Sequence, residues 1–363
     1  ASFMACRVNV SFVPHSRPLS TLYNLSAFGL PPTHAFETLS LVQTRPLPCS
    51  GLSWDQVILD IASDKMVSVA LARGGAWDVH VSTPLDFILS ETPCKDNGGL
   101  VIDVGANVGY FSAQSARSGC EVHSFEPQPL PNLALTSTAA INHWSVNPRR
   151  IVSQPSLTIH RNPVGSGEGR TMMFPTAPVQ GNVGGVASNR CALAKFPNNL
   201  ACRPINTTSL DKLFFKRLET TTHRRLVILK VDVEGFEADV LSSASQLIKT
   251  RKISHIFLEL TPGSARNPKL GVQQNFALLK SLEAAGYALA EIPFVGYTQA
   301  VLPFVLPIGD VAGQHGSSIE LLVERCAARR CIGRDGKARA FTDIWASRDG
   351  VEIFKRYNQS FRR

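Results

Sequence analysis

A glycine turn between two acidic residues is the strongest chemical signal in the sequence. Residues 100–104 form an apolar run broken only by Asp103, which is typical of a buried parallel strand. Gly105, Asn107 and Gly109 follow, and glycine and asparagine adopt the positive φ angles of a tight turn at low cost. A helix is expected over about residues 108–117, and the N–H groups at its start need a polar ligand. Strand, turn and helix together predict the first half of a nucleotide-binding α/β unit.

The two acidic residues narrow the choice of ligand. The G-x-N-x-G spacing differs from the G-x-G-x-x-G of dinucleotide enzymes. Asp103, at the end of the first strand, would repel a phosphate and suits a ligand with an ammonium or sulfonium charge. Glu126 follows the next strand, about twenty residues past the turn, where an acidic residue binds ribose hydroxyls. A ligand that carries a ribose and a cationic group but no phosphate matches S-adenosylmethionine. The alternative is that the turn is only structural and binds no cofactor.

Five motifs follow one another over about half of the chain. They are D-V-G-A-N-V-G-Y-F-S at 103–112, H-S-F-E-P-Q-P at 123–129, T-T-S-L-D-K-L at 207–213, L-K-V-D-V-E-G-F-E-A-D-V-L at 229–241 and F-L-E-L at 257–260. Together they resemble the motifs of the FkbM-family methyltransferases. The resemblance implies methyl transfer from S-adenosylmethionine, usually to a hydroxyl of a sugar, polyketide or related molecule. In this interpretation the cofactor is bound by Asp103, Gly105, Ala106, Asn107, Gly109, Glu126 and Asp232.

Apolar runs alternate with helical patterns through the same segment. Helices are predicted over 129–142 and 273–285. This alternation predicts an α/β fold with a mostly parallel sheet and helices on both faces. The resemblance implies the Rossmann-like class I methyltransferase fold, with seven strands and the last one antiparallel beside the fifth. The strands are predicted at 100–104, 121–125, about 157–161, 226–231, 253–260, 287–292 and 342–347.

Three acidic residues follow the fourth and fifth predicted strands. Asp232 and Glu234 come just after the fourth strand, and Glu259 lies at the end of the fifth. Ligands of open α/β sheets bind beyond the carboxyl ends of the strands, so these side chains are expected to converge near the methyl group. A carboxylate there can take the proton of a hydroxyl nucleophile, which makes Asp232, Glu234 and Glu259 the catalytic candidates. Lys230, inside the fourth strand, is expected to be the buried ion partner of an acid.

Other roles for these acids stay open. Asp232 can contact the cofactor or order its loop, and Glu234 can cap the following helix, where a carboxylate favours the N-terminal dipole. We predict no metal site; Mg²⁺ held by the three acids is the less favoured alternative, because oxygen ligands suit it. A catalytically silent cofactor-binding or interaction domain and, less favoured, a nicotinamide-dependent oxidoreductase are the alternative functions. N- and C-methylation also stay open, and the sequence does not identify the acceptor.

The composition limits the class of protein. The chain has 363 residues, 44% of them hydrophobic, which is enough for a full core. No run of eighteen apolar residues occurs, so no transmembrane segment is expected. The net charge of +9 gathers late in the chain and predicts a solvated basic surface; attraction of an acidic partner or substrate, such as a polyanionic glycan, nucleic acid or membrane surface, is the alternative. No interleaving of aromatic and basic residues indicates a nucleic-acid module, so the expected partner is a small-molecule or glycan acceptor. The oligomeric state is not predictable.

Cysteines and glycosylation sequons give a weak indication of compartment. The eight cysteines form no C-x-x-C motif, so no zinc site is expected. Cys120 is expected to be a buried thiol, whereas Cys191 with Cys202, and Cys326 with Cys331, are close enough for local disulfides. These features weakly favour a secretory lumen. A targeting or anchor segment can have been removed before Ala1. The N-x-S/T sequons begin at Asn9, Asn24, Asn206 and Asn358.

Three regions are predicted along the chain. Residues 1–50 are rich in proline and are expected to form an irregular arm or linker. Residues 51–97 are expected to cover the cleft, with a helix at 54–61, a hairpin of 66–71 with 77–81, and a helix at 84–92 capped by Thr83. Residues 98–363 are assigned to the methyltransferase domain, with an insertion at about 293–341 that contains a helix at 318–328. Long insertions near a ligand often set substrate choice.

Overall fold

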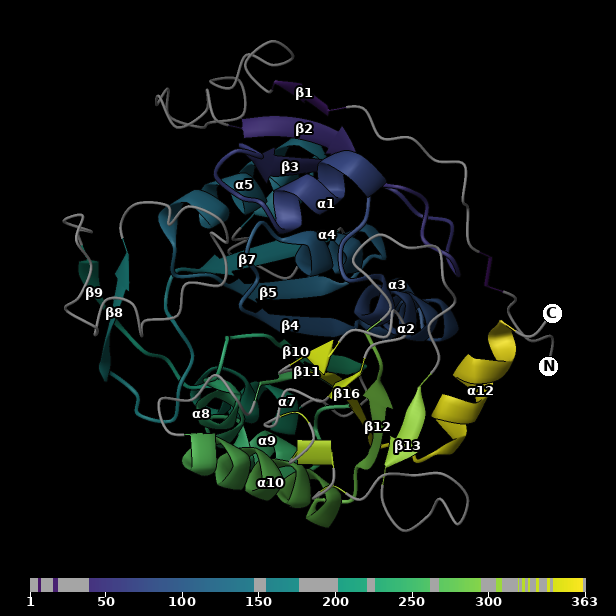
Figure 1. Ribbon diagram of the computed structural model, residues 1–363, viewed down its shortest axis with the longest axis vertical. Helices are drawn as coiled ribbons and strands as arrows, with labels where there is room; N and C mark the ends of the chain where they lie inside the picture. Colours follow the sequence, from purple (N-terminus) through teal and green to yellow (C-terminus); the bar gives the residue numbers. More distant parts are fainter. Residues whose placement is uncertain are drawn as a thin grey trace.

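The computed structural model shows a single large sheet at the centre of the molecule (Figure 1). The structure describes residues 6–7, 16–18, 39–146, 155–175, 202–220, 226–261, 268–294, 305–308, 319, 322–323, 326, 331–332, 338–339 and 342–361. In this part of the chain the central sheet has nine strands in the order β13-β12-β16-β11-β10-β4-β5-β7-β6. They are β4 (Leu100–Val104), β5 (Glu121–Phe125), β6 (Ser145–Val146), β7 (Ser156–His160), β10 (Val227–Val231), β11 (His255–Leu260), β12 (Ala288–Ile292), β13 (Leu306–Ile308) and β16 (Thr342–Ser347).

The sheet has the class I methyltransferase arrangement. β4 is parallel to β5 and β10, and β10 is parallel to β11. β16, the last strand in the chain, inserts antiparallel between β11 and β12. The predicted seven strands are all present, and β6 and β13 extend the two edges. The predicted fold class is therefore confirmed.

Helices cover both faces of this sheet. Successive residues of β4 belong to different hydrophobic clusters: Val101 packs with α4 and α5, whereas Leu100 and Ile102 pack with α8, α9 and α10. This alternation follows from the two-residue period of a strand. Figure 1 shows the second group of helices below the sheet. The bounds of these helices are α4 (Tyr110–Arg117), α5 (Pro129–Ile141), α8 (Glu237–Ser242), α9 (Ser245–Lys249) and α10 (Pro268–Ala284).

The strands nearest the site begin and end within two residues of their predicted bounds. β4, β5 and β16 have the predicted bounds, because each is a short run of residues that is mostly or wholly buried. β10 and β11 begin one and two residues after their predicted starts. The helix after the glycine turn begins at Tyr110, because Gly109 has φ +85° and cannot be part of it.

Two elements predicted within residues 51–97 have a different type in the structure. The expected helix at 54–61 is strand β3 (Asp55–Leu59), which joins β2 (Leu39–Gln43) and β1 (Ser16–Pro18) in an antiparallel sheet. Residues 56–59 are all buried, so this run is a strand covered on both faces rather than an amphipathic helix. The expected hairpin is a pair of helices, α1 (Val67–Gly74) and α2 (Val79–Glu91).

The helix pair has a local physical basis. Val67, Ala70 and Leu71 are buried at helical spacing, and Gly75, at φ +63°, ends α1. α2 starts before the predicted position, so Pro84 lies inside it. Thr83 does not cap a helix; its hydroxyl donates instead to the carbonyl of Val79. The remaining elements are α3 (Cys94–Asn97), β8 (Thr171–Pro175), β9 (Cys202–Asn206), η4 (Asp211–Phe215), α7 (Lys216–Glu219), β14 (Cys331–Ile332), β15 (Ala338–Arg339) and α12 (Glu352–Ser360).

Disulfides tie the N-terminal segments to the core. Cys120 is not a free thiol as predicted; it is bonded to Cys94, and both side chains are buried. A second disulfide joins Cys6 to Cys49. Cys202 and Cys326 are also disulfide-bonded. Cys191 and the side chain of Cys331 lie outside the described residues, so the predicted local pairings stay predictions.

The segment between β12 and β16 is described only in part. Ile319, Leu322, Val323 and Cys326 are helical and buried, in agreement with the helix predicted at 318–328. The division of the chain at residues 50 and 97 stays a prediction. Among the described residues, none of the helices has both the length and the apolar character needed to cross a membrane.

Candidate functional site

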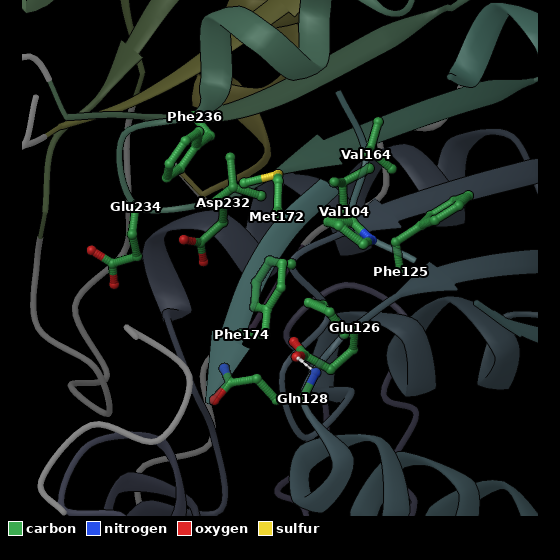
Figure 2. A pocket seen from close by; sticks show the side chains of 14 residues that line it. Val104, Phe125, Glu126, Gln128, Val164, Met172, Phe174, Asp232, Glu234 and Phe236 are labelled. Atoms are coloured by element: carbon green, nitrogen blue, oxygen red, sulfur yellow. Dashed lines mark hydrogen bonds between the residues drawn. The ribbon is translucent and has the colours of Figure 1, made fainter. Parts of the chain in front are cut away.

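A cleft opens at the carboxyl ends of β4, β5 and β10. Its volume is about 560 Å³ when the part open to solvent is included. The strand order places the turn after β4 between the segments that follow β5 and β10. Open α/β sheets bind their ligands at this position. The lining residues are Val104, Gly105, Phe125, Glu126, Pro127, Gln128, Pro163, Val164, Met172, Phe174, Asp232, Val233, Glu234 and Phe236 (Figure 2).

The glycine turn is held by the protein's own backbone. The N–H groups of Gly105 and Ala106 both donate to the carbonyl oxygen of Phe125, at 3.0 and 3.1 Å. Gly105 has φ +80°, and a Cβ atom there would lie 1.8 Å from the carbonyl oxygen of Asp232. Asn107 also has a positive φ, of 52°. Gly105 is therefore required by close packing of two strand ends, whether or not a ligand is bound.

Glu126 lies at the predicted position, in the wall of the cleft. Its side chain is buried, and its two oxygens accept the N–H groups of Asn107 at 3.0 Å and Gln128 at 2.8 Å. Burial raises the pKa of Glu126 to about 7, although these two hydrogen bonds act in the opposite direction. Glu126 therefore both orders the turn and presents a carboxyl group to the cleft.

Asp103 lies beneath the cleft rather than in its wall. It is fully buried and accepts a hydrogen bond of 2.6 Å from the hydroxyl of Ser112, which also bonds Ser124. Burial raises the pKa of Asp103, and Lys230, whose Nζ is 3.7 Å from Oδ1, opposes the rise. Any effect of Asp103 on a ligand would therefore pass through Lys230. Ala106, Asn107 and Gly109 also lie in the turn without lining the cleft.

Lys230 connects this buried acid to the cleft, as a buried ion partner was predicted to do. Its Nζ atom is 3.1 Å from Oδ2 of Asp232 and 3.4 Å from the carbonyl oxygen of Gly105. It also lies 4.9 Å from the centre of the Phe111 ring. Burial disfavours the charge of Lys230, but Asp232 and Asp103 outweigh it and raise the pKa above its usual value. Lys230 thus stays protonated and fixes Asp232.

The structure brings the three predicted catalytic acids together. Asp232, Glu234 and Glu259 each offer a carboxylate oxygen, and these oxygens lie within 4.8 Å of one another. Figure 2 shows the carboxylates of Asp232 and Glu234 pointing to the same side. Glu234 has φ +53°, a strained conformation of the kind that gathers at functional sites. The helix-cap alternative finds no support, because α8 begins with Phe236 as its N-cap and has no side-chain cap.

Like charges dominate this group, which we call the acid cluster (Asp232, Glu234 and Glu259). Burial, followed by the charges of Asp232, Glu234 and Asp343, raises the pKa of Glu259 well above its usual value. A positive ligand group or a proton would relieve this repulsion. Oxygen donors at this spacing also fit a divalent cation such as Mg²⁺. The acid cluster can therefore accept a proton, attract a cationic ligand or hold a metal.

Three further residues near the acid cluster were missed from the sequence. Nε2 of His80, in α2, lies 2.7 Å from Oδ2 of Asp343, in β16. Asp343 is paired directly opposite Glu259 in the sheet. Burial raises the pKa of Asp78 to about 7, with weaker effects from His80, Asp343 and Asp232. The only sequence signal for them was an aspartate in the otherwise apolar strand T-D-I-W-A; nothing marked Asp78 or His80.

Comparison with known proteins identifies the family. A family model described as the methyltransferase FkbM domain matches residues 103–289, just over half of the chain. No curated protein sequence matches. Among solved structures, precorrin-6y C5,15-methyltransferase from Geobacter metallireducens is 11% identical, with 74% of this chain and 88% of that chain covered and a TM-score of 0.27. An O-methyltransferase family protein from Burkholderia thailandensis is 14% identical, with 74% and 56% covered and a TM-score of 0.27. These structural similarities are too low to support an argument, but the family match shows that the chain belongs to the FkbM family of methyltransferases.

Proposed function

We propose that this methyltransferase moves the methyl group of S-adenosylmethionine to a hydroxyl oxygen of a sugar, a glycan or another small molecule. The observation that carries the proposal is the convergence of Asp232, Glu234 and Glu259 within 4.8 Å, at the ends of two neighbouring strands beside the cleft. Methyl transfer to a hydroxyl requires a group that removes its proton. A carboxylate at the rim of the cofactor cleft meets that requirement.

The cleft fits the cofactor in shape and charge. The charged side chains that line it are Glu126, Asp232 and Glu234, and all three are acidic. Glu126 would accept the ribose hydroxyls, and the apolar wall that includes Phe125 and Phe174 would hold the adenine ring. Asp232 and Glu234 would favour the positive charge of the methyl-bearing end. This division of the cleft accounts for the absence of a phosphate-binding motif.

The acid cluster would act on the acceptor. When bound, S-adenosylmethionine supplies a methyl group activated by its sulfonium. Lys230 holds Asp232 at 3.1 Å, which fixes this carboxylate at the rim of the cleft. Asp232, Glu234 and Glu259 would bind the acceptor hydroxyl, take its proton as the oxygen attacks, and keep the oxygen aligned for in-line displacement.

The test uses variants that keep the shape of the acids. We expect Asp232→Asn and Glu234→Gln to lower turnover by about 10²–10⁴-fold, while affinity for the cofactor changes little, because a base acts only when the acceptor loses its proton. Transfer of tritium from labelled S-adenosylmethionine to neutral methyl glycosides measures turnover, and calorimetry measures affinity. Asp211→Asn is the matched control, because Asp211 accepts the N–H groups of Gln246 and Leu247 away from the cleft.

Three outcomes would change the proposal. If neither variant slows transfer, the acids are structural and positioning alone drives the reaction. If a chelator stops the wild-type enzyme and Mg²⁺ restores it, the acids serve as metal ligands. If the protein binds cofactor but transfers methyl to none of the glycosides, extracts of glycans and lipids are tested next as acceptors. No transfer to these extracts either would indicate a silent cofactor-binding domain.

We also infer that the protein matures in an oxidising compartment, such as the secretory lumen. Cys6–Cys49 and Cys94–Cys120 are disulfides, and Cys202 and Cys326 are disulfide-bonded as well. Such bonds persist in oxidising compartments and are rare in the cytosol. An S-adenosylmethionine supply in that compartment is then required.

A further inference from the structure

A buried histidine–aspartate pair lies behind the acid cluster. The side chain of His80 is 1% exposed and that of Asp343 is 12% exposed, and their polar atoms are 2.7 Å apart. A carboxylate can only accept, so Nε2 of His80 carries the proton and donates it to Oδ2 of Asp343. The His80 ring also packs on Phe294 in a T-shaped arrangement, with ring centres 4.9 Å apart. The ring packing and the hydrogen bond together fix the orientation of the imidazole.

Asp343 transmits this constraint to the acid cluster. It sits directly opposite Glu259 in the antiparallel pair of β16 and β11. Side chains of directly opposite residues point to the same face of a sheet, with Cβ atoms about 4.5–5.5 Å apart. Glu259 in turn lies within 4.8 Å of Asp232 and Glu234. A continuous row of polar groups therefore runs from α2, through β16 and β11, to the rim of the cleft.

Both members of the pair lie outside the segment that the family model matches. That segment covers residues 103–289, whereas His80 precedes it and Asp343 follows it. The family domain thus contributes the acid cluster, and the two flanking segments contribute the support behind Glu259. No sequence motif of the domain predicts this support.

We propose that His80 is a positioning residue for methyl transfer: by holding Asp343 against Glu259, it fixes the carboxyl group of Glu259 toward the acceptor hydroxyl. This role rests on the proposed function of the acid cluster. Two neighbouring carboxyl groups repel each other in a buried setting, so Asp343 needs a donor on its other side to remain beside Glu259. Without His80, Asp343 would turn away and Glu259 would lose its fixed orientation.

The same two strands provide a matched control pair. His255 begins β11, and its Nε2 atom lies 3.6 Å from Oδ2 of Asp349, just after β16. This histidine is also buried and also bonded, since Trp345 donates to its Nδ1 atom at 3.3 Å. However, it lies at the opposite end of the strands from Glu259. A change at His255 therefore reports on a histidine–aspartate pair whose role is structural.

The kinetic test compares four proteins in full-length form: wild type, His80→Asn, His80→Gln and His255→Asn. The asparagine side chain is too short to reach Asp343, whereas glutamine can place its amide nitrogen near the position of Nε2. Tritium transfer to a mixture of neutral methyl glycosides gives kcat, and calorimetry with S-adenosylhomocysteine gives cofactor affinity. We expect His80→Asn to lower kcat by about 10–100-fold at nearly unchanged affinity, the cost of a misplacement of about 1 Å. His80→Gln should recover most of the loss, and His255→Asn should keep wild-type kcat.

A structural measurement makes the test independent of the acceptor. Crystal structures of wild type and His80→Asn with S-adenosylhomocysteine should show that Asp343 leaves Glu259 in the variant, and that Glu259 changes its rotamer. Unchanged positions of both side chains would overturn the proposal, as would equal kcat in wild type and His80→Asn. If the wild type methylates none of the glycosides, the sugar acceptor of the proposed function is wrong, and the crystal structures alone decide the role of His80. If His80→Asn does not fold, His80→Gln is compared with wild type in both measurements. The proposal requires kcat to stay near the wild-type value if Asp343 remains beside Glu259 in the variant crystal structure and to fall if Asp343 has left it; the opposite pairing would overturn the proposal.

Discussion

Replacement of Glu126 by glutamine separates its two roles in the cleft. The carboxylate accepts the N–H groups of Asn107 and Gln128, and it also lines the cleft. Glutamine keeps the size and one acceptor oxygen, but its amide nitrogen must face a second backbone donor. Glu126→Ala would instead leave both N–H groups without a partner and disturb the turn itself. Glu126→Gln is therefore the cleaner perturbation.

The structure sets the size of both effects. A hydrogen bond to a charged group contributes about 1.5–3 kcal/mol, so the loss of one such bond should lower the free energy of unfolding by that amount. If the carboxylate also accepts the ribose hydroxyls, cofactor affinity should fall by a further 1.5–3 kcal/mol or so, which is about 10- to 150-fold. A role confined to the turn would give the first effect without the second.

Asp86 offers a matched control. Its buried carboxylate accepts the N–H groups of Cys49 at 2.6 Å and Ser50 at 3.2 Å, away from the cleft. Burial raises the pKa of Asp86, as it does for Glu126. Urea unfolding should show similar losses for Asp86→Asn and Glu126→Gln, whereas calorimetry with S-adenosylhomocysteine should show weaker binding only for Glu126→Gln. Equal affinities of the two folded variants would refute the ribose assignment.

The pKa of Glu126 adds a second readout. Burial raises it from 4.5 to about 7, and the ionised form is the better acceptor for hydroxyl groups. Affinity of the wild type should therefore fall about tenfold between pH 8 and pH 6, and Glu126→Gln should lack this dependence. The sign for stability follows from the same shift. Because the pKa of Glu126 is higher in the folded protein, its contribution to the free energy of unfolding is fully present below about pH 4.5 and is lost as the pH rises through 7.

Two further predictions test the turn and the compartment. Gly105→Ala should lower the free energy of unfolding by about 2–5 kcal/mol, because Gly105 has a positive φ and an added Cβ would clash with the Asp232 carbonyl. Gly51→Ala is the control in urea unfolding: Gly51 has φ +68° but open space where the Cβ would lie, so this variant measures the cost of the positive φ alone. In protein secreted from eukaryotic cells, Asn206 should carry a glycan, because it is exposed at the end of β9. Asn358 should carry none, because its side-chain amide bonds both the N–H and the carbonyl of Val305 at 3.0 Å. Peptide mapping after glycosidase treatment measures both positions. An unmodified Asn206 in folded, secreted protein, or a modified Asn358, would contradict this reasoning.

The sequence by itself determined the centre of the fold and the acidic residues of the cleft. β4 lies between two glycines, and β5 begins after Cys120 and ends two residues before Pro127, so their limits can be predicted from local pattern alone. The convergence of Asp232, Glu234 and Glu259 was also predictable, because carboxyl ends of neighbouring parallel strands meet at one edge. These predictions needed only strand type and strand order, which the motifs supply together.

Tertiary structure alone decided the surroundings of this centre. β3 was predicted as a helix because its apolar run carries no period when both faces are buried. Asp103 was expected in the cleft, but Ser112 and Lys230 hold it beneath. His80 and Asp343 are 263 residues apart, and no local pattern records that they touch. Burial and contact between distant segments depend on how the whole chain packs, and a residue's neighbours in the sequence do not contain that information.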